Sequence, residues 1–166
     1  MKTEVPQIRT GFGYDVHAFT DKKPLILGGE KIPHTHGLEG HSDADVLLHA
    51  IADALLGAAA LRDIGYHFPD TDPRFKGADS QKLLAEVIAL LAEKGFVLGN
   101  LDATVCMEKP KLLPFIPKMQ ENIAQICKVD LDAVSIKATT SEKMGFVGRK
   151  EGAAAYCTCL IFKQSN

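Results

Sequence analysis

Apolar residues recur at helical spacing in three stretches of the chain, and each stretch has a matching start or stop signal. The first stretch predicts a helix that begins at Ser42 or Asp43, because either side chain can accept hydrogen bonds from the free amides of a first turn. A second helix is predicted over residues 79–94, with Gly95 as its end signal. A third is predicted over residues 114–127, since proline suits the first turn of a helix. The broad apolar stripe of the first helix consists of Val46, Leu47, Ala50, Ile51, Ala54 and Leu55.

Shorter apolar runs separated by turn signals predict strands. The expected strands span residues 9–19, 25–27, 30–32, 96–107, 134–139 and 153–162. Gly28 and Gly29 are expected to form the turn of a small hairpin. Strands and helices are interleaved without a strict alternation of one strand and one helix. The chain of 166 residues is therefore predicted to be a single α+β domain, residues 1–166, with two layers, a mixed β-sheet and helices on one face of it.

The last predicted strand is apolar on both of its faces. Residues two apart in a strand point the same way, so Tyr156, Leu160 and Phe162 share one face. The other face carries Cys157, Cys159 and Ile161. Because helices are expected on one side of the sheet only, the second apolar face needs another cover, and we expect another subunit to supply it.

Charge and hydropathy narrow the function classes. The net charge is −2, so the chain lacks the broad basic surface that is typical of nucleic-acid-binding proteins. A phosphate ligand must instead be bound by a few placed groups. The most apolar stretch, residues 50–61, contains Asp53 and is too short to span a bilayer. We therefore expect neither nucleic acid nor a membrane among the partners.

Targeting and cysteine signals indicate an intracellular protein. Residues 1–8 include Lys2, Glu4 and Pro6 and lack the apolar core of a signal peptide. The four cysteines are Cys106, Cys127, Cys157 and Cys159. They contain no Cys-x-x-Cys pair, which favours core packing over disulfides or metal binding. A bacterial cytoplasmic location is expected, and a plastid location would require that a transit peptide has been removed.

Two separated motifs supply the residue types of a zinc site. Asp15 and His17 are two apart on a predicted strand and share one face, and His49 lies in the first predicted helix. Taken alone, Asp-x-His is typical of a surface pair and a lone helix histidine of a core residue. Together, two imidazoles and a carboxylate form a common three-ligand zinc set that leaves a fourth position for substrate. Asp45, one turn before His49, is either an outer partner of that ligand or a charge at the helix start.

Three further segments carry polar groups that suit a phosphate ester. His41 and Ser42 stand where a helix start offers free amides to a phosphate, with capping as the alternative. Asp63 and Asp70 lie in an irregular Gly- and Pro-rich segment and can accept hydrogen bonds from sugar hydroxyls, with turn formation as the alternative. Residues 138–149 combine hydroxyls, a carboxylate and an arginine, which suit a diphosphate with a divalent ion or, alternatively, a helix cap. Each segment taken alone is equally compatible with a local structural role. Only the combination of all these segments favours a functional site.

These motifs, in this order, resemble one enzyme family over nearly the whole chain. The matching segments are residues 9–17, 40–49, 63–80, 110–112 and 137–152. On these segments the sequence resembles the 2-C-methyl-D-erythritol 2,4-cyclodiphosphate synthases. The segments GHSDAD (residues 40–45) and FPDTDP (residues 68–73) are the most specific to that family.

The resemblance implies a homotrimer around a threefold axis, with three active sites between neighbouring subunits. It implies Zn²⁺ bound by Asp15, His17 and His49, and a second ion, Mg²⁺ or Mn²⁺, bound by Glu142 and substrate phosphates. The implied catalytic residues are Asp15, His17, His41, His49, Thr140 and Glu142.

The resemblance also assigns substrate contacts by position. The implied phosphate contacts are His41, Ser42, Thr139 and Thr140. The implied ribose contacts are Asp63 and Gly65, with Phe68 and Asp70 beside the methylerythritol. The implied cytosine pocket is Pro110, Lys111, Leu112 and Leu113, and Phe146 and Arg149 are implied to line an axial cavity that can take an isoprenoid diphosphate. Two departures from the family pattern are Arg62, where a glycine is common, and residues 107–109, where small residues are common.

The implied reaction converts a cytidine diphosphate ester, 4-diphosphocytidyl-2-C-methyl-D-erythritol 2-phosphate, to the 2,4-cyclodiphosphate with release of CMP, a step of the non-mevalonate isoprenoid pathway. Two other interpretations remain. A metal-dependent phosphohydrolase would use the same Asp and His residues with water as nucleophile. A nucleotide- or isoprenoid-diphosphate-binding trimer without turnover would keep residues 139–149 and tolerate the loss of His49.

Overall fold

A computed structural model describes residues 7–164 of the chain. Residues 1–6, most of the segment predicted not to be a signal peptide, lie outside the described residues. The elements are β1 (Ile8–Thr20), β2 (Leu25–Leu27), β3 (Glu30–Ile32), β4 (Gly37–Leu38), α1 (Val46–Ala58), α2 (Ile64–His67), η1 (Pro73–Phe75), α3 (Ser80–Glu93), β5 (Phe96–Cys106), η2 (Leu113–Phe115), α4 (Ile116–Cys127), η3 (Leu131–Ala133), β6 (Val134–Thr139), α5 (Gly145–Gly148) and β7 (Gly152–Lys163). Within residues 7–164 no helix has the length and apolar character needed to span a membrane.

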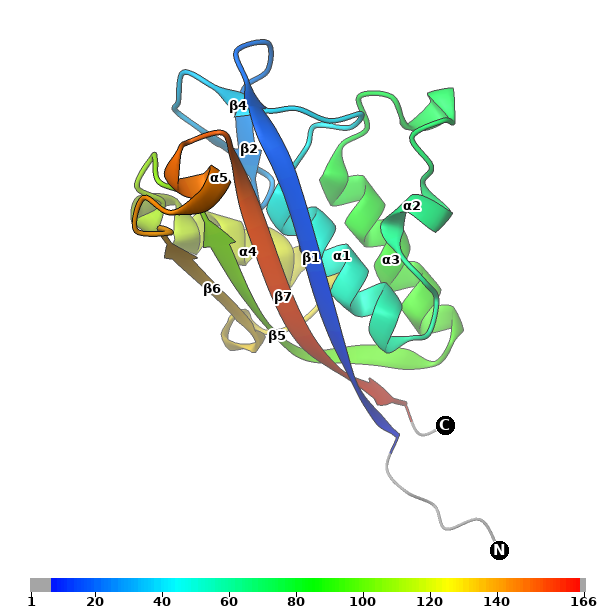
Figure 1. The fold of residues 1–166 in the computed structure, drawn as a ribbon. Coiled ribbons are helices and arrows are strands. Elements are labelled where there is room, and N and C mark those ends of the chain that lie inside the picture. The colour runs from blue at the N-terminus through cyan, green and yellow to red at the C-terminus, as the bar shows by residue number, and fades with distance from the viewer. Residues whose placement is uncertain (1–6, 165–166) are drawn as a thin grey trace, which may run out of the picture.

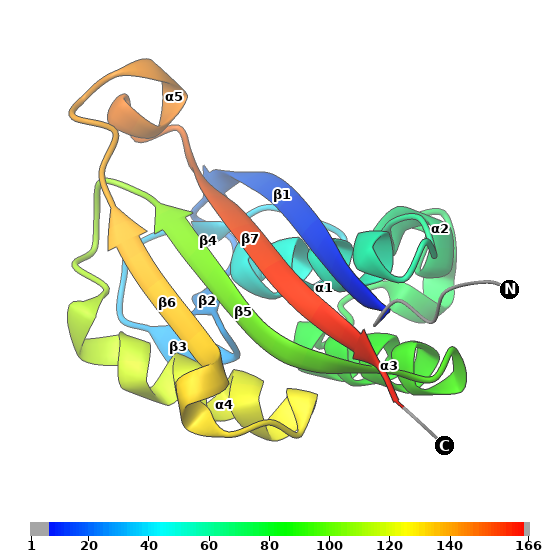
Figure 2. The same cartoon turned by 90° about the horizontal axis from the view of Figure 1, so that it is seen from below.

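The main sheet is mixed and has five strands in the order β4-β1-β7-β5-β6. Strand β7 is central and pairs antiparallel with β1 and β5, whereas β6 is parallel to β5. Strands β2 and β3 form the separate hairpin predicted around Gly28 and Gly29. Helices α1, α3 and α4 cover one face of the sheet (Figures 1 and 2), which confirms the predicted two-layer α+β fold.

Helix α1 is the central element of the core and lies against β1 and β7. Glycines at alternate positions of β1 allow this approach, because a Cβ atom at Gly13 would lie 1.9 Å from the backbone oxygen of Ala50. A Cβ atom at Gly11 would lie equally close to the oxygen of Ala54. The strand therefore meets the helix backbone to backbone, and side chains near this contact are held in a fixed relation.

Two local predictions about the elements were wrong, and one further short helix was not predicted. The first helix begins at Val46 rather than near Ser42, because Asp45 is its N-cap and accepts a hydrogen bond from the Leu48 amide at 3.0 Å. The segment after α1, expected to be irregular, contains the short helices α2 and η1. The glycine-rich segment after β6 contains one helical turn, α5. An aspartate side chain caps the first turn of α1, α2 and η1, whereas Met144 at the start of α5 makes no such hydrogen bond.

The buried face of β7 includes Cys157 and Cys159, and Cys127 is buried at the end of α4. Burial raises the pKa of the Cys127 thiol to about 12 and that of Cys159 to about 11. These thiols therefore stay protonated and pack as small apolar groups, which confirms core packing as their role.

The opposite face of the sheet is apolar and exposed in the single chain. Tyr14 and Tyr156 pair across β1 and β7 with ring centroids 5.1 Å apart, and 42% and 40% of their surfaces are exposed. Phe12, Val16 and Phe162 are also exposed large apolar residues. The prediction that β7 is buried on both faces therefore holds within one chain for one face only.

Candidate active site

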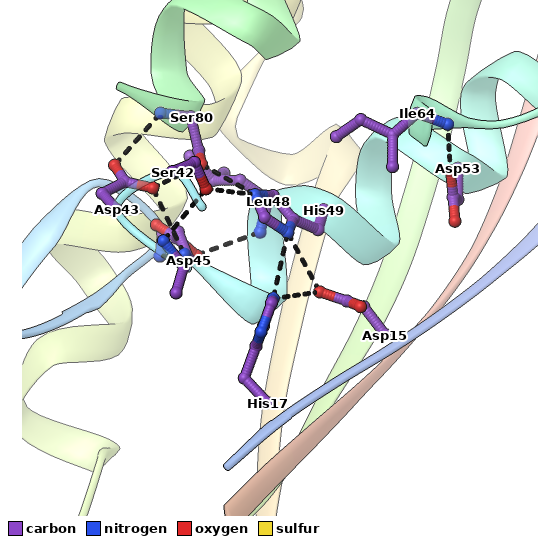
Figure 3. A network of polar contacts seen from close by, with 12 residues as sticks. Asp15, His17, Ser42, Asp43, Asp45, Leu48, His49, Asp53, Ile64 and Ser80 are labelled. Carbon is purple, nitrogen blue, oxygen red and sulfur yellow. Dashed lines mark hydrogen bonds and ion pairs between the residues drawn. The ribbon is translucent and has the colours of Figure 1, made fainter. Parts of the chain in front are cut away.

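Three side chains from β1 and α1 converge beside the close contact of these two elements. Asp15 Oδ2 lies 2.9 Å from His17 Nε2 and 3.0 Å from His49 Nδ1, and the two histidine nitrogens are 3.2 Å apart. The three side chains are only 12–25% exposed (Figure 3). The sequence placed Asp15 and His17 on one strand face and His49 in a helix, and the fold brings the three together.

The three donor atoms fit a divalent metal ion such as zinc. Bonds of about 2.0–2.1 Å in tetrahedral geometry place zinc ligands roughly 3.3 Å from one another. The three observed distances, 2.9, 3.0 and 3.2 Å, form a nearly equilateral triangle only slightly smaller than that. Two imidazole nitrogens and one carboxylate oxygen are also the donor types that zinc accepts, and they leave one position for another ligand.

The electrostatics of the three groups favour an ionised carboxylate. Burial by itself would raise the pKa of Asp15, but the hydrogen bonds and charges of His17 and His49 outweigh burial and lower that pKa to about 2. Burial would lower the pKa of His49, yet Asp15 and the more distant Asp45 and Asp43 raise it. The site is thus an anionic position next to two imidazoles, which suits cation binding.

Asp45 belongs to the framework of the site rather than to the ligand set. Its carboxylate is fully buried and accepts hydrogen bonds from the Gly28, Gly29 and Leu48 amides at 3.0, 2.8 and 3.0 Å. Burial raises its pKa to about 6 despite these amides. No hydrogen bond joins Asp45 to the His49 ring within the described residues, so Asp45 caps α1 and attaches the hairpin turn to it.

A cavity of about 420 Å³ opens beside the three side chains. Many of the predicted site residues line it, namely His17, His41, Ser42, His49, Gly65, Phe68 and Asp70, together with the apolar Ile64, Phe75 and Leu83. A lining that combines polar groups with apolar and aromatic side chains is typical of a small-molecule site.

Comparisons with known proteins give the family. A family model described as the YgbB family matches residues 8–162. The 2-C-methyl-D-erythritol 2,4-cyclodiphosphate synthase of Geobacter metallireducens is 60% identical over 154 residues, which are 93% of this chain and 98% of that protein. The chain belongs to the 2-C-methyl-D-erythritol 2,4-cyclodiphosphate synthase family.

Solved structures agree with this family in fold. The bifunctional IspDF from Campylobacter jejuni is 46% identical with a TM-score of 0.93, and the match covers 97% of this chain and 44% of that one. A CDP complex of IspF from Plasmodium falciparum is 31% identical with a TM-score of 0.84, and the match covers 98% of this chain and all of that one. That relative therefore binds a cytidine nucleotide, CDP.

A second group of the predicted site residues lies around a smaller cavity of about 110 Å³. Its lining includes Pro110, Lys111 and Leu112 after β5, Thr139 at the end of β6 and Thr140 directly after it. Leu113 does not line it and is 77% exposed. Figure 1 shows the ends of β5 and β6 on one side of the molecule and α2 with α3 on the other. One chain of the synthase therefore carries two separate sets of predicted site residues.

Other predicted residues of the synthase are engaged in local contacts. The Asp63 carboxylate caps α2 and accepts from the Tyr66 amide at 2.8 Å. Glu142 is exposed and accepts from the Thr140 hydroxyl at 3.1 Å. Arg149, after α5, donates to Glu151 at 2.8 Å, and Phe146 lies within α5. Arg62 adopts a left-handed backbone with φ 73°, which glycine favours, and its guanidinium lies 4.4 Å from the Tyr66 ring centre.

Three residues contact the predicted site residues or their loops but were not assigned to the site from the sequence. Ser80 lies 2.9 Å from His49 Nε2, and Asp43 accepts from the Ser80 hydroxyl. Glu108 accepts from the Ser141 and Lys143 amides at 3.1 and 3.3 Å and so holds the loop after β6. A short polar residue at a helix start was interpreted only as a cap, and Glu108 only as a departure from the family pattern.

Proposed function

We propose that the chain is a zinc-dependent homotrimer that converts 4-diphosphocytidyl-2-C-methyl-D-erythritol 2-phosphate to 2-C-methyl-D-erythritol 2,4-cyclodiphosphate and CMP. The observation that carries the proposal is the convergence of Asp15, His17 and His49 in a chain 60% identical to a synthase of that name. The CDP complex of the Plasmodium falciparum relative supports a cytidine nucleotide as part of the substrate.

The reaction needs no protein nucleophile. An oxygen of the substrate's own 2-phosphate attacks the β-phosphorus in line, a new P–O–P bond closes the ring, and the bond from the β-phosphorus to the bridging oxygen of CMP breaks. The electron pair of that bond leaves with CMP as a phosphate oxyanion. Zinc bound by Asp15, His17 and His49, with Mg²⁺ or Mn²⁺ at Glu142, would neutralise phosphate charge during this step.

The residues of the larger cavity position the reacting phosphates. Ser42 is buried beside His49, and His41 is exposed next to it, so both can donate to phosphate oxygens. Phe68 and Asp70, which line the same cavity, are assigned to the methylerythritol carbons and hydroxyls. Holding the two phosphate ends of one flexible substrate in line accounts for a large part of the rate acceleration, because the entropy cost of bringing them together is paid on binding.

The residues of the smaller cavity are contributed by a neighbouring subunit. Pro110, Lys111, Leu112 and Leu113 are assigned to cytosine, with Asp63 and Gly65 of the first subunit on the ribose. Thr139, Thr140 and Glu142 are assigned to the diphosphate and its metal ion. Two observations support this assembly: the two residue sets are separate in one chain, and the apolar face of β1 and β7 is exposed without a partner. Phe146 and Arg149 are assigned to an axial cavity for an isoprenoid diphosphate.

Product analysis tests the reaction. The purified protein is incubated with the diphosphocytidyl methylerythritol phosphate and Mg²⁺, and the products are followed by ³¹P NMR. We expect two coupled cyclic-diphosphate signals that grow in step with CMP. Release of orthophosphate would refute the cyclisation and establish a phosphohydrolase. An unchanged spectrum from folded, zinc-loaded protein would leave a binding protein without turnover.

The subunit arrangement has its own test. Tyr156→Glu places a charge on the exposed apolar face without touching the metal ligands, and we expect it to convert a trimer to monomers in light scattering. The monomers should keep zinc but lose turnover. A Tyr156→Glu protein that remains trimeric would refute the assignment of this face to the subunit contact.

A further inference from the structure

The buried Ser80 and the half-buried Asp43 form a chain of hydrogen bonds behind His49, on the side away from Asp15 and His17 (Figure 3). Ser80, at the first turn of α3, is 1% exposed, and its Oγ lies 2.9 Å from His49 Nε2. The Ser80 hydroxyl donates to Asp43 Oδ1 at 2.5 Å, and the Ser80 amide donates to Asp43 Oδ2 at 3.0 Å. The two carboxylate oxygens of Asp43 therefore accept hydrogen bonds from the hydroxyl and the amide of Ser80.

The direction of these hydrogen bonds follows from counting protons. An ionised carboxylate only accepts, so the single hydroxyl proton of Ser80 is directed to Asp43. Ser80 Oγ then has only lone pairs left for His49, and it must accept from an Nε2–H group. The imidazole is thus required to hold a proton on Nε2.

Ser42 reinforces the same arrangement. Its Oγ lies 3.1 Å from His49 Nε2 and accepts from the Ala44 amide at 3.1 Å. Two hydroxyl oxygens therefore face Nε2, while Nδ1 faces Asp15 Oδ2 at 3.0 Å and His17 Nε2 at 3.2 Å. With the proton on Nε2, the neutral ring has its lone pair on Nδ1, inside the triangle of donor atoms.

We propose that Asp43 and Ser80 are positioning residues that select the Nε2–H tautomer of His49 and thereby set the metal affinity of the site. The proposal rests on the metal site of the proposed function. A histidine ligand is more basic and better oriented when its other nitrogen donates to a fixed acceptor, and the loss of such an outer partner costs about 10–100-fold in metal affinity. Here the acceptor is a serine whose own proton is directed by a carboxylate.

The substitution Asp43→Asn reverses the relay while preserving its shape. Each oxygen of Asp43 faces an amide that can only donate: the Ser80 amide lies 3.0 Å from Oδ2, and the Asp45 amide lies 3.3 Å from Oδ1. The asparagine oxygen takes the shorter of these two contacts, to the Ser80 amide, so the asparagine NH₂ group faces Ser80 Oγ. The Ser80 hydroxyl then turns its proton toward His49 Nε2. This arrangement moves the imidazole proton of His49 to Nδ1, where it prevents the nitrogen from binding the metal ion. Replacing one carboxylate oxygen by an NH₂ group thus inverts the tautomer of His49.

Zinc affinity measured by competition with a chromophoric chelator tests the relay. We expect Asp43→Asn to bind zinc about 10–100-fold more weakly than the wild type. Ser80→Ala, which leaves Ser42 as the remaining acceptor, should lose less, and Ser80→Thr should retain nearly wild-type affinity because it keeps the hydroxyl. Asp79→Asn is the matched control: Asp79 caps the same helix and accepts from the Gln81 amide at 2.9 Å, but it does not contact Ser80 Oγ or His49.

A second readout separates the relay from a loss of folding. Imidazole ¹⁵N shifts of the metal-free wild type, with His49 neutral, should show a proton on Nε2, and those of Asp43→Asn a proton on Nδ1. A wild type with its proton on Nδ1, or a folded Asp43→Asn protein with wild-type zinc affinity, would overturn the relay alone. Failure of the wild type to bind zinc would instead overturn the metal site of the proposed function.

Discussion

The close contact between β1 and α1 allows the metal site to be perturbed without touching any ligand. Gly13 lies two residues before Asp15, and its missing side chain faces the backbone of α1 next to His49. In Gly13→Ala the new Cβ would lie 1.9 Å from the Ala50 oxygen and 2.6 Å from the Ala54 nitrogen. Both neighbours are backbone atoms, so no side chain can rotate out of the way.

The size of the effect follows from these distances. The Cβ contact has to lengthen from 1.9 Å to at least 3.0 Å, below which real Cβ contacts essentially never occur. Strand and helix must therefore separate by about 1 Å, and such overpacking typically costs about 1–3 kcal/mol of unfolding free energy. His49 moves with α1, whereas Asp15 and His17 stay with β1. Metal ligands tolerate errors of only about 0.2 Å, so the third ligand is lost.

We expect Gly13→Ala to bind zinc more than about 100-fold more weakly than the wild type, beyond the range caused by loss of an outer partner. The assay combines chelator competition with thermal unfolding of the metal-free protein. Gly57→Ala is the matched control, because it adds a methyl group to α1 where the nearest atom is 4.0 Å away. It should keep zinc affinity and gain about 0.5–1 kcal/mol of stability by removing a helix glycine.

Gly13→Ala with unchanged zinc affinity would refute this reasoning, since it would mean that α1 can retreat without carrying His49 away. Equal zinc loss in Gly13→Ala and Gly57→Ala would also refute it. In that case any methyl group added in or against α1 would disturb the metal site, and the backbone contact at Gly13 would have no special role.

Three other perturbations test separate parts of the molecule. His49→Ala should lose zinc and turnover but keep the wild-type oligomeric state; full activity in zinc-free His49→Ala would exclude the metal assignment. Asp45 has a folded pKa of about 6, raised by burial above its ordinary value of 3.8, so its charge destabilises the fold above about pH 6 and this penalty disappears as pH falls toward 4. Urea titrations should therefore show the unfolding free energy of the wild type, relative to Asp45→Asn, rising by about 2 kcal/mol between neutral pH and pH 4; a pH-independent difference would contradict this. Glu108→Ala frees the Ser141 and Lys143 amides and should raise KM about 10-fold, whereas Glu108→Gln, which keeps an acceptor, should change KM little; equal KM values for the two variants would count against a role of Glu108 in holding this loop.

Sequence patterns predicted the main elements because each has a local signal. Period-two and helical spacing located β1, β5, β6, β7 and the three long helices, and Gly95, which adopts φ 74°, ends α3 as expected. Asp15, His17 and His49 were also selected from the sequence, because strand periodicity places the first two on one face and their residue types complete a known ligand set.

Long-range contacts account for what the sequence did not predict. Ser80 is 31 residues from His49 along the chain, and Glu108 is 33 residues from Ser141, so no local spacing reveals either contact. Asp45 was recognised as a charge near the helix start, but its bonds to the turn at Gly28 depend on how the hairpin folds back onto α1. Tertiary packing decided the role of each of these polar residues, whose local preferences allow several roles.

Neighbouring residues of β1 point to opposite faces of the sheet and have different roles there. Asp15 and His17 face α1, whereas Tyr14 and Val16 face outward onto the exposed apolar surface. The pairing with β7 runs without interruption from Ile8 opposite Phe162 to Ala18 opposite Gly152. A slip of this pairing by one residue would turn the metal ligands to the outside and put tyrosine and valine in their place. The long uninterrupted pairing with β7 therefore fixes which residues of β1 face α1. Chain insertions near β1 are tolerable only where they leave this register unchanged.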